Sequence, residues 1–275
     1  MIKAKVIADS IYDGKNRLTT LELEYPRYIH SQILTHRVMS RNAASSRAIP
    51  IDKMITLITK NPVEPIWTMK KSGMVGDLAE DESIISEATR EWHEAMLDAC
   101  KHARKLEELG IHKQNANRLL EPFQHVKTII TGSEWDNFFK LRLDSHAQPE
   151  IQELARKMKS AMDKSVPFEC IGVNGYWHTP YVSTIEAVEE LGWEKAKKIS
   201  ASCCAQVSYR KLDTSEDKAI DIFRKLVSSD IIHGSALEHV CRPMKANEKY
   251  RLGNLKGWHQ FRHEVENKIA CGLKI

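Results

Sequence analysis

The first 26 residues form two runs of alternating hydrophobic and polar positions. Residues 2–12 favour a strand, and Leu21, Leu23 and Tyr25 alternate with glutamates in the second run. Residues 13–16, Asp-Gly-Lys-Asn, have the composition of a tight turn. The pattern therefore predicts an N-terminal β-hairpin.

Farther along the chain, apolar side chains recur at helical spacing. The strongest stripe lies in residues 81–109, and Gly110 follows its last turn. Prolines suit the first turns of two other helices, at Pro26 and Pro149. The predicted helices cover residues 26–37, 52–61, 81–109, 115–120, 133–141, 149–164, 184–200 (with a break at Gly192) and 215–229. The expected helix caps include Asp52, Ser133 (with Asp136), Thr184 and Ser215.

Strands are predicted only towards the chain ends, the last of them at residues 237–244. The opening helix is expected to lead into a loop closed by Pro50, and residues 63–80 to form another loop. No Gly-rich phosphate loop or low-complexity segment is present. The pattern favours one α+β domain over residues 1–275, with several helices flanking the sheet.

Composition narrows the function classes. The 275 residues are 42% hydrophobic and 28% charged, as in soluble globular proteins. A net charge of +4 suits anionic small ligands and is too weak to indicate nucleic acid. No apolar run reaches the ~18 residues of a membrane span, and MIKAKVIADS is not a signal peptide. We therefore expect a cytoplasmic protein.

Six cysteines show no CxxC spacing. Without a secretory signal, reduced thiols are expected. The pair Cys203-Cys204 leaves a metal site open as an alternative, although adjacent cysteines rarely chelate one ion. His233 and His239 are also poorly spaced for metal binding. We predict no metal.

The segment from Gln32 to Pro50 concentrates hydrogen-bond donors. Arg37, Arg41 and Arg47 lie among serines within about a dozen positions. A core needs no such density of donors, and an ordinary surface carries more lysine and glutamate. This composition predicts an anion site, with phosphate as the expected anion.

Three further clusters carry polar chemistry. They are Asn117–Pro122, Asn137–Gln148 and His233–His239. Taken alone, Arg142 is as readily explained by a structural acid partner as by a substrate, and His146 by a helix end. The aromatic tail at 253–263 either stacks a ligand ring or packs in the interior.

Together these clusters resemble the flavin-dependent thymidylate synthases, the ThyX family. The opening H-R-x2-S-x-N-x2-S-x-R is similar to the RHR-x7-S signature, and residues 141–150 match its LR-x-DSHAQ-x-E segment. Residues 205–209 (AQVSY) and 233–239 (HGSALEH) resemble its ARVSY and GH-x-(S/T)-PFEH segments. The resemblance implies a ThyX-like, mostly antiparallel sheet.

The order of these segments differs from the family's usual one. The two segments that usually come first lie here within residues 198–245, behind the RHR-like and DSHAQ segments of residues 1–170. This order predicts a circular permutation, which is feasible where chain ends lie close together. It also predicts that the strand after His239 lies beside the strand that starts near Thr19.

The resemblance implies a role for each matching residue. The implied dUMP-binding residues are Gln32, Ser45, Ser46, Arg47, Arg118 and Arg142. The implied FAD-binding residues are His36, Arg37, Asn42, Asn137, His146, Ser235 and Glu238. Arg142 would hold the uracil ring and stabilise charge that develops on it, which makes it the catalytic candidate. Arg118 would serve a neighbouring subunit, so a homotetramer is expected.

The implied reaction is reductive methylation of dUMP to dTMP, with FAD, methylenetetrahydrofolate and NADPH. Thr35, Ala43 and Ala48 depart from the family pattern, at positions of an arginine, a glutamate and an aromatic residue. These departures leave two alternatives: a paralogue that makes another 5-substituted pyrimidine nucleotide, such as a hydroxymethylated one, or a non-catalytic nucleotide-binding protein. Neither a membrane nor a nucleic-acid partner is expected.

Overall fold

A computed structural model describes residues 1–170, 176–208, 213, 215–227, 232–245, 248 and 253–273. It confirms the N-terminal hairpin: β1 (Lys3–Tyr12) and β2 (Asn16–Pro26) pair antiparallel around a turn in which Asp13 and Gly14 have positive φ. These two residue types tolerate the left-handed region best, which explains the turn chemistry of the sequence.

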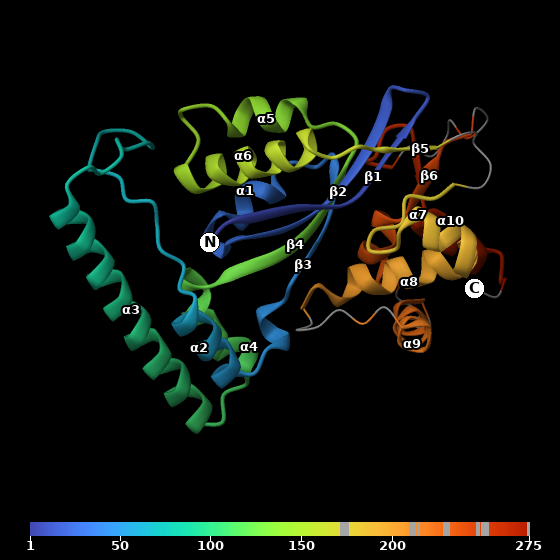
Figure 1. The fold of residues 1–275 in the computed structure, drawn as a ribbon. Coiled ribbons are helices and arrows are strands. Elements are labelled where there is room, and N and C mark those ends of the chain that lie inside the picture. Colours follow the sequence, from blue (N-terminus) through green and yellow to red (C-terminus); the bar gives the residue numbers. More distant parts are fainter. Residues whose placement is uncertain are drawn as a thin grey trace.

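The hairpin lies inside a five-stranded sheet (Figure 1). The strand order is β3-β4-β2-β1-β5, with β3 at Met39–Ala43, β4 at His125–Gly132 and β5 at Phe168–Cys170. All pairings are antiparallel except β1 with β5. The predicted α+β class with a mostly antiparallel sheet is thus confirmed.

Three of these strands, β3, β4 and the short β5, were not expected. Strand β3 replaces the predicted loop, because its polar residues pair with β4 at the sheet edge. Strand β4 lies mid-chain, where no strand was predicted, although its sequence HVKTIITG is β-branched. Residues that pair across about ninety positions leave no local pattern, so the edge strand was read as a loop.

Helices account for most of the remaining chain. They are α1 (His30–Leu34), α2 (Ile51–Lys60), α3 (Glu82–Glu108), α4 (Lys113–Ala116), α5 (Asp136–Arg142), α6 (Pro149–Asp163), α7 (Thr184–Glu186), α8 (Trp193–Ala205), α9 (Glu216–Val227) and α10 (Phe261–Ala270). Short 3₁₀ turns are η1 (Arg27–Ile29), η2 (Ser46–Ala48), η3 (Asn117–Phe123), η5 (Gln206–Ser208) and η6 (Gly234–His239), and a π turn is η4 (Ala187–Leu191). The long helix and the helix that begins at Pro149 are confirmed.

Several predicted helix ends were wrong. Helix α1 ends at Leu34 rather than Arg37, since the Arg41 guanidinium takes the carbonyl oxygens of Leu34 (3.0 Å) and His36 (2.8 Å). Ser133 does not cap α5, which starts at Asp136, and Asp52 lies inside the first turn of α2. Ser183, rather than Thr184, caps α7, and α8 continues to Ala205.

One face of the sheet packs under α5 and α6 (Figure 1). Leu21, Leu23 and Tyr25 of β2 are fully buried there against Ile151 and Leu154 of α6. A second apolar cluster joins α2 to α3 and η3, at the other end of β3. The alternating residues of β2 therefore became the core face, as predicted.

The C-terminal third packs on the opposite face, where Ile129 of β4 meets Cys204, Val207 and Ala236. The predicted strand at 237–244 is shorter: it comprises β6 (Cys241–Pro243), which follows η6 and pairs with β7 (Trp258–Gln260). No pairing joins β6 to β2 among the described residues, so the strand prediction drawn from the permuted order was wrong.

The tail at 253–263 is largely interior. Trp258 and Phe261 are buried, and the helix α10 follows, which the sequence pattern did not reveal. The side chains of Asn254 and Gln260 hydrogen bond with Ser40 of β3, at 2.9 and 3.0 Å. This segment therefore holds the beginning of β3 in place. In the described part of the chain, no helix is both long and apolar enough to cross a membrane.

Candidate functional site

Arg142, the last residue of α5, reaches the end of α1. Its Nε donates to His36 Nε2 at 3.0 Å, and its Nη2 donates to Thr35 Oγ1 at 3.1 Å and to the Gln32 carbonyl at 3.2 Å. Its Nη1 reaches Gln32 Oε1 at 3.4 Å. The partners come from residues 32–36, so the opening motif and the DSHAQ-like segment meet here. We name Gln32, Thr35, His36 and Arg142 the arginine cluster.

No carboxylate neutralises Arg142 among the residues that the structure describes. Its pKa is lowered by burial alone, which reflects the desolvation of a half-buried cation. The guanidinium group is thus oriented by neutral acceptors and keeps its charge for a ligand. A structural acid partner, the simpler explanation of this residue, is absent from the described part of the chain.

His36 is buried, and Phe138 packs edge-on against its ring at 4.9 Å. Burial lowers the pKa of His36, and the positive charges of Arg142 and Arg41 lower it further. Because Arg142 donates to Nε2, that nitrogen carries no proton and the ring is the neutral Nδ1–H tautomer. His36 therefore acts here as an acceptor.

Other residues of the DSHAQ-like segment are placed differently. Gln148 accepts from the Gln32 side chain at 2.6 Å, which extends the arginine cluster. His146 is highly exposed, and its ring and backbone N–H both bond to Asp144, each at 2.8 Å. These bonds lower the pKa of Asp144. His146 therefore lies outside the cluster.

Asn137 lies at the start of α5 and shares a hollow of about 500 Å³ with His36. The walls include Val38, Trp135 and Phe138, and Lys15 and Lys256 line the same hollow. The lining is therefore mixed: these apolar and aromatic side chains share it with a larger number of polar and charged ones. Two of the residues implied for FAD are therefore brought together. Arg37 is exposed.

Ser45, Ser46 and Arg47 form a turn at the far end of β3, named here the serine loop. Asn117, fully buried, donates to the Ser46 carbonyl at 2.8 Å and to the Ile49 carbonyl at 2.9 Å. These two hydrogen bonds from a buried side chain hold the serine loop in place. Ser46 is buried, Ser45 half-buried and Arg47 exposed.

Arg118 lies close to the serine loop in the same chain. Glu121 accepts from Arg118 Nη1 at 2.6 Å and from Ser46 Oγ at 3.2 Å, and it forms an ion pair with Arg27 at 3.1 Å. One carboxylate thus balances two arginines. No sequence motif had indicated Arg27 as a site residue.

A cavity of about 390 Å³ opens beneath the serine loop. Three cationic side chains line it, Arg27, Lys53 and Lys127, together with the single carboxylate of Glu24. Its wall is apolar, with Met54, Leu57, Ile58, Val126 and Val207 among the lining residues. None of the three cations was predicted as a site residue, because η1, α2 and β4 bring them to one cavity only in the folded chain.

The remaining implied flavin residues lie on the C-terminal third. Asn42 donates to the carbonyl of Cys204 at 2.6 Å, which ties β3 to the end of α8. Glu238 pairs with Arg262 at 2.5 Å, and Ser235 is exposed on η6. Tyr209, the last residue of the AQVSY segment, lies outside the described residues. Among the described residues, no hydrogen bond or ion pair joins Asn42, Ser235 or Glu238 to the arginine cluster.

The predicted residues therefore form separate groups. The arginine cluster precedes β3 and the serine loop follows it, and five extended residues span about 16 Å. Within the described residues, no three His, Cys, Asp or Glu side chains are grouped as a metal would require. Cys100, Cys170, Cys203, Cys204 and Cys241 are buried thiols, as the sequence suggested, and Cys271 is exposed.

The fold is an α+β arrangement of a mostly antiparallel sheet with flanking helices. An oriented arginine lies at one end of its edge strand β3, and a cation-lined cavity lies at the other end. A family model described as "Thymidylate synthase complementing protein" matches residues 18–168. This range exceeds half of the chain, so the chain belongs to that family, the flavin-dependent thymidylate synthases. The resemblance seen in the motifs is confirmed.

Relatives carry the same description. A "Flavin-dependent thymidylate synthase" of Thermosipho melanesiensis is 30% identical over 154 residues, which cover 54% of this chain and 64% of the relative. One of Sulfurisphaera tokodaii is 29% identical over 210 residues, 72% of this chain and 74% of the relative. The chain thus spans less than two thirds of the Thermosipho relative, and 49% of one from Pyrococcus abyssi.

A solved structure titled as a UMP/dUMP methylase from Streptomyces cacaoi bound with 5-Br UMP is also similar. It is 16% identical, has a TM-score of 0.48, and the match covers 60% of this chain and 89% of that one. The family match ends at residue 168, before the segments at 205–209 and 233–239. The permuted order therefore stays a prediction.

Proposed function

We propose that this chain is a flavin-dependent enzyme that methylates C5 of a pyrimidine nucleotide, with conversion of dUMP to dTMP as its reaction. Methylenetetrahydrofolate is the proposed one-carbon donor and NADPH the proposed reductant of the flavin. Family membership supports the reaction class. The observation that carries the proposal is the arginine cluster, in which neutral groups orient a guanidinium group that has no carboxylate partner among the described residues.

In this proposal Arg142 binds the uracil ring. A fixed cation beside the base stabilises negative charge that develops there as C5 becomes nucleophilic. The neutral acceptors Gln32, Thr35 and His36 hold the guanidinium plane before the nucleotide arrives, so orientation costs little at the moment of reaction. The protein's contribution is thus binding, orientation and charge.

The hollow of His36 and Asn137 fits the ring-bearing part of a flavin. Within its mixed polar and apolar lining, Trp135 and Phe138 offer aromatic surface to a planar ring, and the Asn137 amide offers both a donor and an acceptor. His36 and Asn137, which line this hollow, are proposed flavin contacts. The other proposed contacts lie outside its lining: Arg37, Asn42, His146, Ser235 and Glu238. When bound, reduced flavin supplies the hydride that completes the methyl group.

The serine loop and Arg118 are proposed to bind the nucleotide phosphate, through Ser45, Ser46 and Arg47. Strand β3 lies between the serine loop and Arg142 of the same chain, and its length exceeds what one mononucleotide easily spans. This separation supports sites shared between copies in a homotetramer. Leu34, Val38 and Leu141 flank the arginine cluster and are 44–52% exposed. Such apolar exposure around a polar cluster supports cover by a ligand or a second copy.

A decisive experiment starts with the colour of the purified protein. Flavin absorption is expected, followed by formation of dTMP from dUMP, methylenetetrahydrofolate and NADPH, identified by mass spectrometry. A different 5-substituted product would favour the paralogue, which Thr35 supports because it stands beside Arg142 in place of the family's arginine. A protein that binds nucleotide but cannot be reconstituted with FAD would indicate the non-catalytic alternative.

A further inference from the structure

The cavity beneath the serine loop has the features of a phosphate pocket. Its volume of about 390 Å³ lies within the roughly 300–1,000 Å³ typical of small-molecule sites. Cationic side chains reach it from three separate elements: Arg27 from η1, Lys53 from α2 and Lys127 from β4. Three cations face one carboxylate, Glu24, which is itself paired with Lys3 at 2.9 Å. The pocket therefore favours an anion.

One buried donor in the same wall lacks a partner among the described residues. Gln124 is 5% exposed and lines the cavity, and its Nε2 has no hydrogen-bond partner among the described residues. A buried amide N–H without a partner is destabilising, and a ligand oxygen placed there would accept its hydrogen bond. Ser46, also 5% exposed, lines the same cavity, and its Oγ donates to Glu121.

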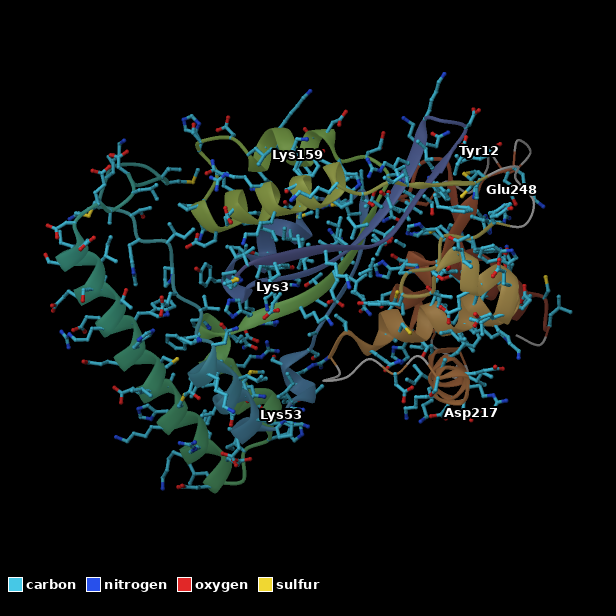
Figure 2. The ribbon with its side chains drawn as sticks, viewed as in Figure 1. Lys3, Tyr12, Lys53, Lys159, Asp217 and Glu248 are labelled. Carbon is cyan, nitrogen blue, oxygen red and sulfur yellow. The ribbon has the colours of Figure 1, made fainter. Side chains whose placement is uncertain are left out.

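Lys53 differs from the other two cations. Arg27 is paired with Glu121 at 3.1 Å, and Lys127 with Glu22 at 2.8 Å. Lys53, labelled on α2 in Figure 2, is half-buried and has no carboxylate partner among the described residues. Its ammonium group is therefore available to neutralise a bound anion at little competing cost.

The apolar part of the wall indicates what else the ligand carries. Ile49, Met54 and Leu57 line the cavity beside the cations, and Val126 and Val207 lie on the sheet side. An isolated inorganic anion would gain nothing from these groups. A phosphomonoester on a sugar or a ring would bury apolar surface there while its phosphate meets the lysine.

We infer that this cavity binds the phosphomonoester end of a nucleotide, with Lys53 as its principal counter-charge and Gln124 as a neutral donor. The identity of the nucleotide rests on the proposed function; the pocket itself rests on the lining residues. Neither Lys53 nor Gln124 belongs to the motifs that carry the family resemblance. The pocket thus adds two phosphate-binding residues to the serine loop.

Calorimetric titration with dUMP and with deoxyuridine tests the inference. Lys53→Met is expected to raise the Kd for dUMP about tenfold, equivalent to about 1.4 kcal/mol, and to leave the Kd for deoxyuridine unchanged. Lys53→Arg should retain most of the affinity. Lys60→Met is the matched control, since Lys60 ends the same helix and does not line this cavity. Equal dUMP affinity in Lys53→Met and the parent chain would overturn the inference.

A parallel titration separates failure of the pocket from failure of the proposed function. If the parent chain does not bind dUMP, the same proteins are titrated with AMP, CMP and ribose 5-phosphate. Binding of any of these that is weakened by Lys53→Met and not by Lys60→Met supports the pocket and rejects the substrate. Absence of binding by all of them rejects the pocket. Unfolding curves of each variant ensure that only folded proteins are compared.

Discussion

Arg142 Nε lies 3.0 Å from His36 Nε2, and this bond joins two segments separated by 106 positions. The donor is a permanent cation, so the histidine must accept and stay neutral. His36 in turn is held by burial and by the edge-on contact with Phe138. The pair is therefore an arginine whose direction is set by a buried ring.

Replacement of Arg142 by lysine should abolish most activity, because one ammonium group cannot reproduce bonds from Nε, Nη1 and Nη2 to separate acceptors. We expect kcat/KM with dUMP to fall about 100-fold, or about 2.7 kcal/mol. Steady-state assays measure this loss. Arg156→Lys, on the exposed side of α6, is the control and should keep parental activity. Normal turnover by Arg142→Lys would remove Arg142 from the proposed site.

Thr35 offers a finer test of the same geometry. Its Oγ1 donates to the Gln32 carbonyl at 2.7 Å and accepts from Arg142 at 3.1 Å. Thr35→Val keeps the shape and removes both bonds, with an expected loss of about 1 kcal/mol in binding of dUMP, or about fivefold in Kd. Thr35→Ser keeps the hydroxyl group and should bind as the parent does. Equal affinities of the valine and serine variants would contradict this role.

Local patterns predicted the parts of the fold that local forces build. The hairpin at Asp13-Gly14 and helices α3 and α6 follow from turn chemistry, apolar stripes and an early proline. Strand β3 was not predicted, because its polar residues form a strand only by pairing with β4. Helix α10 was not predicted, because its apolar stripe is weak: only its residues Phe261 and Val265 are buried.

The candidate site, like the fold, could be predicted only in part from the sequence. Motif resemblance predicted Gln32, His36 and Arg142, which do meet, and Ser45 and Ser46, which line one cavity. The same resemblance grouped His146 and Glu238 with a flavin, and those side chains bond to Asp144 and Arg262 instead of the arginine cluster. Lys53 and Gln124 could not be predicted, because no pattern in one sequence reveals which lysine faces a cavity formed by distant strands.

Asn117 should couple stability to ligand binding. Its Nδ2 donates to two carbonyls of the serine loop from a fully buried position. Asn117→Ala leaves both acceptors without this donor, which is expected to cost about 1–3 kcal/mol of unfolding free energy. Urea unfolding measures this loss, and dUMP affinity should fall as well because the loop loses its support. The exposed Asn115→Ala, on α4, is the control. A destabilised variant with parental dUMP affinity would show that the loop does not bind the nucleotide.

Acid should destabilise the fold through two histidines at the centre of the sheet. His178 hydrogen bonds with Ser10 at 2.8 Å and Thr20 at 2.7 Å, and His239 with Thr131 at 2.8 Å. Burial lowers the pKa of each to about 3. Thr20 and Thr131 bond to each other at 2.6 Å, so these groups form one buried chain.

The unfolded chain protonates these histidines near pH 6.5, whereas the folded chain keeps them neutral to about pH 3. The unfolded state therefore binds more protons between these values, and stability falls as pH decreases through that window. Each histidine should contribute a loss of about 1.4 kcal/mol between pH 7.5 and 5.5. Urea unfolding at both pH values should show a smaller loss, by about that amount, for His239→Gln. His102→Gln, exposed on α3, should keep the parental dependence. An identical pH dependence in His239→Gln and the parent chain would show that His239 is not held neutral in the core.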